Sequence, residues 1–399
     1  MKKRLLLYIL LFFPLFLFAQ KKQIAAARDQ IKTGKDLASA EQSMRALLKD
    51  SANRENTKIW LILCQSLERQ YAKANEKIYL KQKSDTAEFF SVTKRLYETM
   101  AAFDSIDTKP DATGRVNPKY RERHSEYLAS IRPNLFNGGV YQIHRNDYAA
   151  AYDYFDTYIR SDREPLFAAF NFEKDDALMP HAAYWSMYCG YKMENAEKIL
   201  KYMNLAERDS SMLNFVRQYE AEAFLLNKDT VRYVRALQKG FEEYPNFAFF
   251  FPRLVEYYSQ NRMYDSALVV CNKALEADST SVLFRLTKST VLLNLARYDE
   301  CIELCSKLLE QNPENADAHF NMGLAYFDQA IELEKSQHRR AKRGRISQFY
   351  EKALPYLEKY RSLAPQEKDK WFAPLYTIYL NLNMGKEFDA IDKLRNTNG

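Results

Sequence analysis

The sequence predicts an all-α protein, an α-solenoid of antiparallel helix pairs that follows an N-terminal signal peptide. Three observations predict this fold. The chain holds ten glycines in 399 residues, too few for glycine-rich phosphate loops or the tight turns of all-β proteins. Apolar residues make up 47% of it and charged residues 28%, a composition that can bury a core. The C-terminal half also repeats with a period of 34 residues.

Residues 1–19 have the pattern of a cleavable secretory signal peptide. Lys2, Lys3 and Arg4 precede an apolar run from 5 to 18, which ends at the small residue Ala19. As a helix this run is about 21 Å long, short of the roughly 30 Å of a bilayer core. Cleavage after Ala19 is therefore expected, with an uncleaved anchor as the alternative. No cysteine follows the run and no other apolar stretch approaches membrane length, so no lipid anchor and no transmembrane segment in the mature chain are expected.

The charge balance disfavours nucleic acid as a partner. The formal net charge is +7, and it falls to about +4 when the three positive charges of residues 1–19 are removed. Nucleic-acid binders carry stronger, clustered basicity. We therefore expect a mature chain that binds no nucleic acid.

The repeat is visible in windows that start at 214, 248, 282 and 316. When the windows are aligned, one position always holds a small or medium-sized residue: Ala221, Val255, Ser289 and Gly323. The position three residues later always holds a large one: Phe224, Tyr258, Leu292 and Tyr326. The second half of three successive windows keeps one spacing, through Tyr233, Leu237, Gly240 and Pro245, then Ala267, Cys271, Ala274 and Ser279, then Cys301, Cys305, Leu308 and Pro313. Each window thus predicts two helices that pack closely and stack on their neighbours.

This period and this small/large alternation resemble the tetratricopeptide repeat family, most clearly over 214–315. The resemblance implies a superhelix of helix-turn-helix units. It extends to 132–165, and to 181–213 with a turn about one residue short. From Ala316 a further unit has its second helix, marked by Ala353 and Leu357, 18 residues late. A partial unit at 375–394 would cap the array.

These features predict three parts: the signal peptide at 1–19, an N-terminal helical region with degenerate repeats at 20–131, and a repeat array at 132–399. The clearest break in helical periodicity is 107–119, where Pro110, Gly114 and Pro118 lie. The mature chain otherwise has the pattern of one α-solenoid with few linkers, and this break is the favoured place for a boundary within it.

The sequence contains no recognisable catalytic or metal-binding motif. Its five histidines lack HExxH spacing, and GxSxG, CxxC and phosphate-loop motifs are absent. The five cysteines, an odd number, occupy packing columns of the repeat or similar positions, so we expect small buried hydrophobes rather than a disulfide framework. The prediction is a protein that is not an enzyme and has no catalytic residues, metal or cofactor.

Two insertions interrupt the array. The first, 166–180, carries Phe167, Phe170 and Phe172; these rings either dock a partner or fold back over the protein. The second, at about 335–352, is basic, and its cationic side chains are a candidate partner-binding cluster: Arg339, Arg340, Lys342, Arg343 and Arg345. An anionic partner is one interpretation, and a solvated extension of two helices with Gly344 as a hinge is the other.

The family resemblance also implies a peptide-binding groove lined by the first helix of each unit. The corresponding residues here are Gln218, Glu222, Phe249, Glu256, Leu286, Thr290, Phe320 and Leu324. Family members that clamp a peptide carboxylate use lysine, arginine and asparagine in this groove. The apolar and acidic residues of this chain fit an apolar or basic segment better.

The function predicted from these features is that of an exported, non-catalytic scaffold that binds another envelope or exported protein in the bacterial cell envelope. Its expected location is periplasmic or associated with the outer envelope. The alternative is a carbohydrate-binding protein built on tetratricopeptide helices, which would need exposed clustered Trp or Tyr platforms.

Overall fold

The computed structural model describes residues 20–335 and 343–395, and the regular structure in these ranges is helical throughout. The predicted signal peptide lies outside the described residues. Contacts divide the chain into two compact units. Unit 1 ends at Tyr233, and unit 2 begins at Val234. None of the described helices is long and apolar enough to cross a membrane.

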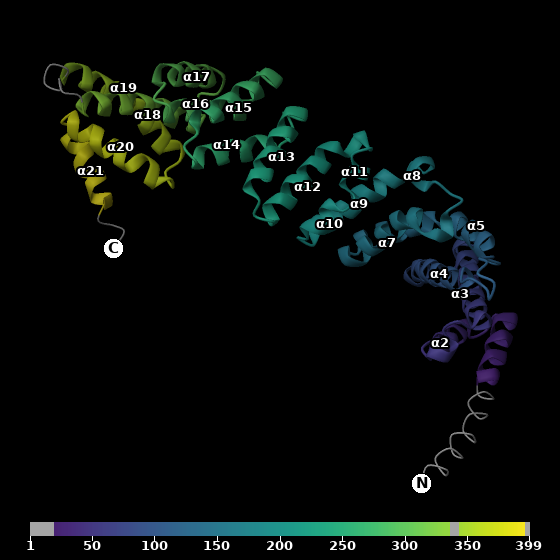
Figure 1. The fold of residues 1–399 in the computed structure, drawn as a ribbon. Helices are drawn as coiled ribbons and strands as arrows, with labels where there is room; N and C mark the ends of the chain where they lie inside the picture. The colour runs from purple at the N-terminus through teal and green to yellow at the C-terminus, as the bar shows by residue number, and fades with distance from the viewer. Residues whose placement is uncertain (1–19, 336–342, 396–399) are drawn as a thin grey trace, which may run out of the picture. The chain divides into compact units, whose positions relative to one another are not determined.

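Unit 1 begins with a helix at 20–33 and continues through successive helices in chain order (Figure 1). These are α2 (Leu37–Leu48), α3 (Thr57–Tyr79), α4 (Thr86–Asp107), α5 (Arg121–Ile131), α6 (Pro133–His144), α7 (Tyr148–Arg160), α8 (Phe172–Asp175), α9 (Met179–Lys192), α10 (Ala196–Leu200), α11 (Met203–Ala206) and α12 (Leu213–Leu226). Helix α13 (Thr230–Glu243) contains the division between the units.

Unit 2 continues as further helix pairs, and Figure 1 shows α18 lying beside α19. Its helices are α14 (Phe250–Gln260), α15 (Tyr264–Ala277), α16 (Val282–Asn294), α17 (Tyr298–Gln311), α18 (Ala316–Lys335), α19 (Arg343–Leu363), α20 (Lys368–Asn381) and α21 (Gly385–Arg395). Consecutive helices contact each other throughout this order, as an α-solenoid requires.

The turn between the two helices of a pair recurs every 34 residues. Glu194, Lys228, Arg262 and Ala296 all adopt a left-handed conformation with φ between 52° and 57°. In each turn the next N–H bonds back to a carbonyl five residues earlier, as in Arg297 to Leu292 at 2.9 Å. This is the hydrogen bond of a Schellman cap, which satisfies free carbonyls at a helix end. The spacing from Glu194 to Lys228 shows that the turn expected to be one residue short has full length.

The predicted small column is buried where helices approach most closely. Ala221 and Ser289 have no exposed surface. A Cβ atom added to Gly323 would lie 2.7 Å from Leu357 Cγ, closer than real carbon contacts allow. The stripes on the second helices are buried as well, including Leu237, the cysteines and Leu308. The sequence periodicity therefore identified the packing faces of both helices in these pairs.

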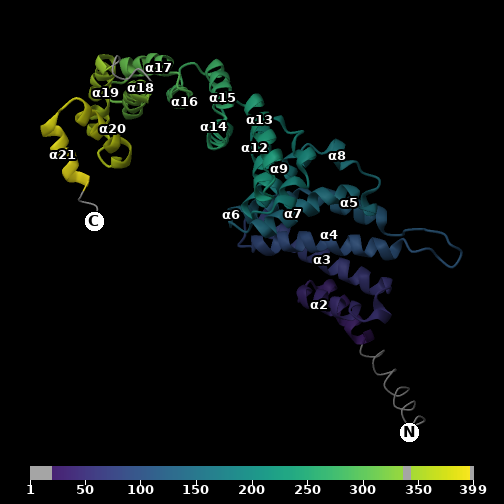
Figure 2. The same ribbon diagram turned by 60° about the vertical axis from the view of Figure 1, so that its left-hand side comes forward.

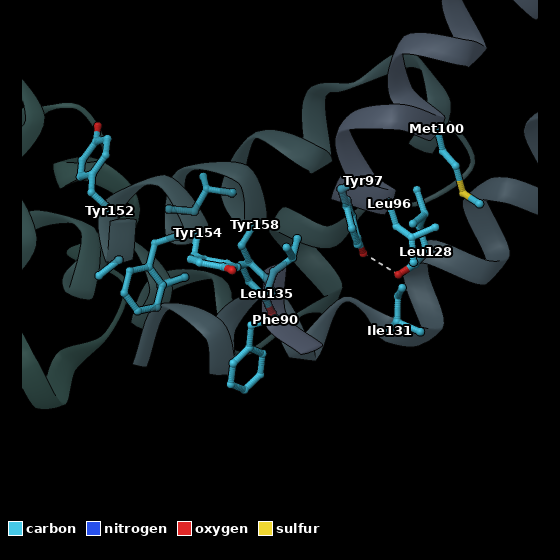
Figure 3. Close-up of a cluster of buried hydrophobic side chains, with 14 of the residues drawn as sticks. Phe90, Leu96, Tyr97, Met100, Leu128, Ile131, Leu135, Tyr152, Tyr154 and Tyr158 are labelled. Atoms are coloured by element: carbon cyan, nitrogen blue, oxygen red, sulfur yellow. Dashed lines mark hydrogen bonds between the residues drawn. The ribbon is translucent and has the colours of Figure 1, made fainter. Parts of the chain in front are cut away.

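The core of unit 1 is rich in aromatic rings. Figure 3 shows Phe90 of α4, Leu135 of α6 and Tyr154 and Tyr158 of α7 in one buried cluster. The hydroxyl of Tyr97 donates to the carbonyl of Leu128, which joins α4 to α5 (Figure 3). These rings fill the space beside small residues on neighbouring helices, since a Cβ at Gly138 would lie 2.8 Å from the Tyr154 ring.

The break at 107–119 is a loop, as expected, but it does not divide the protein. Asp104 of α4 and Arg121 of α5 form a two-pronged ion pair across it, with N–O distances of 2.7 and 2.8 Å. The backbone N–H of Tyr120 also bonds to Asp107 at 2.8 Å. Both sides of the loop belong to unit 1, so the division after Tyr233 falls elsewhere than the boundary predicted from the sequence. Figure 2 shows α4 and α5 in this part of the chain.

The first insertion folds back onto unit 1. Phe167 is buried against Tyr97, with ring centroids 5.8 Å apart. Arg132 lies between the rings of Tyr158 and Phe172, at 3.6 and 4.1 Å from their centroids, and forms an ion pair with Asp176. The insertion therefore covers its own chain, the second of the two interpretations given above.

The second insertion lengthens both helices of one pair. Helix α18 runs on to Lys335, and α19 begins at Arg343. Gly344 lies inside α19 with a helical backbone, so it is not a hinge. Ala353, Leu357 and Tyr360 are buried as expected, which places the late second helix against α18.

Candidate partner-binding surface

Four of the predicted groove positions in unit 2 lie on α14, α16 and α18 with accessible side chains. Glu256 and Thr290 are exposed, and Leu286 and Leu324 are half-buried. Glu256, Thr290 and Leu324 each directly follow a buried residue of the small column. Leu286 lies one turn before Ser289, the column residue of α16. The four side chains therefore lie on the same face of their helices. They form a column of mixed acidic, hydroxyl and aliphatic character.

A polar contact fixes α18 against α16 beside this column. The side-chain amide of Asn321 donates to Ser289 Oγ at 2.8 Å and to Thr290 Oγ1 at 3.0 Å. Asn321 and Ser289 are both buried. Because buried polar groups need partners, this contact sets how the two first helices are positioned relative to each other.

Two predicted groove residues serve packing. Phe249 is only 7% exposed, because its ring meets Phe250 edge-on and the guanidinium of Arg253 covers it at 3.7 Å from the centroid. It precedes the first residue of α14 and does not share the 34-residue column of Glu256. The half-buried ring of Phe320 packs on Tyr360, with centroids 4.7 Å apart. Phe249 is therefore removed from the candidate surface.

In unit 1, the predicted residues Gln218 and Glu222 lie half-buried on α12. The residue 34 positions before Glu222 is Tyr188 on α9, which the sequence analysis missed because it placed the turn of that unit one residue short. Tyr188 is half-buried, as is its neighbour Trp185. The 34-residue spacing back from Glu222 is the signal in the sequence that would have identified Tyr188.

Two aromatic rings, those of Trp185 and Tyr148, meet the Tyr188 ring edge to face. The Trp185 and Tyr188 rings are 5.5 Å apart at an interplanar angle of 89°, and Tyr148 and Tyr188 are 5.9 Å apart at 79°. The ammonium of Lys192 lies 5.6 Å from the Tyr188 centroid.

The basic insertion is described only in part. Arg343 and Arg345 are exposed in the first turn of α19, and the Arg345 guanidinium lies 5.7 Å from the Phe349 centroid. Arg339, Arg340 and Lys342 lie outside the described residues. Of the five cations in the predicted cluster, Arg343 and Arg345 thus lie among the described residues and are accessible.

The cysteine side chains lie in packed parts of the protein. All five cysteines are unbridged and buried. Burial raises the pKa of Cys64, Cys189 and Cys271 to about 12, and the hydrogen bond to Cys305 together with burial raises the pKa of Cys301. Thiols of this kind are poor nucleophiles. In the described ranges no three His, Cys, Asp or Glu side chains gather closely enough to hold a metal ion.

Unit 1 also contains a partly open polar hollow of about 290 Å³ beside α11. Its charged lining includes Glu173, Lys201 and Arg208. Arg208 pairs with Glu173 at 2.5 Å, and Lys201 pairs with Asp156 at 2.6 Å. These three groups therefore take part in ion pairs within the protein.

The helix pairs, their 34-residue turns and their buried small column define an α-solenoid whose repeat unit resembles the tetratricopeptide repeat. No protein-family model and no curated protein matches the chain. Among solved structures, the chain is similar to the C-terminal part of a TPR repeat-containing protein from Cytophaga hutchinsonii, with 14% identity and a TM-score of 0.44 over 65% of this chain and 93% of that one.

Two further solved structures are similar at a comparable level. A TPR repeats protein from Bacteroides fragilis has 16% identity and a TM-score of 0.32, over 66% of this chain and 98% of that one. Yeast Tom70 has 12% identity and a TM-score of 0.35, over 95% of this chain and 92% of its own. At TM-scores below 0.5, these similarities carry no assignment of function.

Proposed function

We propose that this protein is a non-catalytic scaffold that binds a segment of another protein on the first helices of its repeats. The observation that carries the proposal is the accessible column in unit 2. Glu256, Leu286, Thr290 and Leu324 remain accessible, whereas neighbouring positions on the same helices are buried. Stacked repeats present such columns as extended binding surfaces.

The chemistry of the column favours a partner segment with apolar side chains and a basic residue. Leu286 and Leu324 offer aliphatic surface, and Glu256 is an exposed carboxylate that already accepts from Gln260 at 3.1 Å. A cationic partner side chain would complement Glu256 at the rim, where charges set specificity and association rate.

We further propose that the protein is exported and acts in the bacterial cell envelope. The basic start and apolar run of residues 1–19 support export. N-terminal sequencing of the mature protein tests this: a first residue of Gln20 supports it, and an intact Met1 on a cytoplasmic protein contradicts it.

Cross-linked affinity purification of the tagged protein from its native envelope tests the scaffold function. The binding variant is Leu286→Asp with Leu324→Asp. Val269→Asp is the matched control, because Val269 is an exposed aliphatic residue on the second helix α15. We expect one near-stoichiometric protein with the wild type and the control, and its loss with the binding variant.

A third sample distinguishes the column from the basic insertion. It carries Arg339, Arg340, Lys342, Arg343 and Arg345 changed to glutamate. Loss of the partner in this sample alone would move the contact to the insertion. Recovery of no protein from any sample would contradict the scaffold function.

A further inference from the structure

The C-terminal end of α3 projects beyond the helices that pack against it. Residues 75–83 are all exposed, although they form the last turn of a 23-residue helix and the turn that follows it. Among the described residues, the last contacts of α3 with other segments are made by Lys73, whose Nζ donates to the carbonyl of Gly34 at 2.7 Å, and by Ala74, which packs against the core. From Lys73 to Leu80 the chain advances about 10 Å along the helix axis.

Three large apolar side chains lie together at this end. Tyr79 is 85% exposed, Leu80 is 53% exposed and Ile78 is 38% exposed. Single exposed apolar residues are ordinary on protein surfaces, but three in succession at a helix end place apolar side chains on several sides of one tip. The backbone beneath is well capped, since Gln82 N–H bonds to the Lys77 carbonyl at 2.9 Å.

Lysines surround the apolar tip. Lys73, Lys77, Lys81 and Lys83 are all exposed, and none of them forms an ion pair among the residues that the structure describes. The nearby carboxylates in the sequence are Glu76 and Asp85, and Asp85 caps α4 by accepting from the Glu88 N–H at 3.1 Å. The segment 73–85 therefore has a net positive charge.

We propose that the end of α3, from Lys73 to Lys83, is a docking tip for an anionic phospholipid surface. Tyrosine is favoured at the level of lipid headgroups, and aliphatic residues enter the acyl boundary to a depth of roughly 5–10 Å. Lysine stems can lie along apolar surface while their ammonium groups reach lipid phosphates. The tip supplies all three components at one projecting end.

The size of the tip favours a lipid surface over a protein partner. A stable protein interface buries about 800 Å² on each partner, far more than three side chains at the end of one helix supply. A bilayer interface can instead surround a small projection. This role is additional to partner binding by the helix column and does not depend on it.

Vesicle flotation tests the proposal with the chain from Gln20 onward, which retains every described contact. The vesicles contain either phosphatidylglycerol and phosphatidylcholine in equal parts or phosphatidylcholine alone. We expect flotation with the anionic vesicles, and a loss of roughly fivefold in partitioning for each lysine changed to glutamine at Lys77 and Lys81. Tyr79→Ser should also weaken binding.

Matched controls separate the tip from the rest of the surface. Leu380→Ser removes an apolar side chain of similar exposure in unit 2, and Lys386→Gln with Lys393→Gln removes two exposed lysines on α21. We expect the controls to float like the wild type. Equal flotation of the tip variants and the wild type would overturn the proposal.

A direct probe of insertion completes the test. The native cysteines are buried, so Tyr79→Cys can be labelled selectively with an environment-sensitive fluorophore. We expect the fluorescence emission of the labelled Tyr79→Cys variant to shift to the blue when anionic vesicles are added. The emission of the labelled Leu380→Cys variant should not shift. Unchanged emission at the tip would overturn the proposal, as would capture of a soluble protein through the tip with no shift on vesicles.

Discussion

Gly323 lies against Leu357 so closely that any side chain at this position would collide with it. A Cβ atom there would be 2.7 Å from Leu357 Cγ and 3.3 Å from the Leu357 backbone nitrogen. The contact joins α18 to α19, and it shows why the fourth member of the small column is a glycine. The Leu357 backbone nitrogen cannot rotate away as a side chain can, so little room is left for relaxation.

Gly323→Val is therefore expected to lower the free energy of unfolding by about 1–3 kcal/mol through overpacking. The control is Gly344→Ala on α19, where an added Cβ meets no atom within 4 Å. Alanine is the better helix former, so the control should be neutral or slightly stabilising. Urea unfolding of both variants checks the assignment, and a Gly323→Val protein as stable as the wild type would contradict the repeat register.

Arg132 is expected to hold the first insertion in place. It is buried, pairs with Asp176 and donates to the Tyr158 carbonyl at 2.9 Å. Arg132→Met should cost about 3 kcal/mol, because it leaves Asp176 without its partner in a partly buried position. It should also make residues 164–178 sensitive to limited proteolysis.

Arg160→Met is the matched control for this prediction. Arg160 pairs with Asp156 at 3.0 Å, but its side chain is half-exposed. Surface ion pairs contribute less than about 1 kcal/mol, so this variant should unfold and resist protease nearly as the wild type does. Equal effects of the two substitutions would show that the insertion is not held by Arg132.

His124 should make stability depend on pH. Its ring is buried against Phe103 and Tyr120, and burial, assisted by the charge of Arg123, lowers its pKa from 6.5 to about 4. The unfolded chain takes up a proton near pH 6.5 and the folded protein does not. Stability should therefore be full above pH 6.5 and fall as the pH is lowered toward 4.

The size of this effect follows from about 1.4 kcal/mol for each pKa unit, which predicts a loss of roughly 2–3 kcal/mol between pH 6.5 and pH 4. Chemical unfolding across this range measures it. His124→Gln should flatten the profile relative to the wild type. If both proteins lose the same stability over the range, His124 is not the group responsible.

The cysteines should be inert in the folded protein. All five are buried, and burial raises the pKa of Cys64, Cys189 and Cys271. A thiol reagent at pH 8 should therefore find no rapidly reacting group in the native protein and five in denaturant. Fast modification of any native cysteine would contradict the packing role.

The repeated positions were predictable from the sequence, because each packing position recurs in several successive repeats. Ala221, Cys271 and Cys305 could be placed in the core from their spacing alone, and the structure confirms this. Positions that occur once were harder. Phe249 is buried by the guanidinium of Arg253, a contact that no periodicity encodes.

Contacts between segments distant in sequence also escaped prediction. The partner of Arg132 is 44 residues away in an insertion, and the Asp104–Arg121 pair that closes the 107–119 loop joins two different helices. Tyr188 was missed because one misplaced turn shifted its column. Helical periodicity locates faces within a repeat, but it does not determine what an insertion or a loop contacts.

Site-specific photo-cross-linking in the native cell tests the proposed binding column most directly. A photoreactive residue replaces Glu256, Thr290 or, as control, Val269, each of which is exposed. The account predicts one shared protein adduct from positions 256 and 290 and none from 269. Adducts of equal yield from all three positions, or from 269 alone, would contradict a partner site on the first helices.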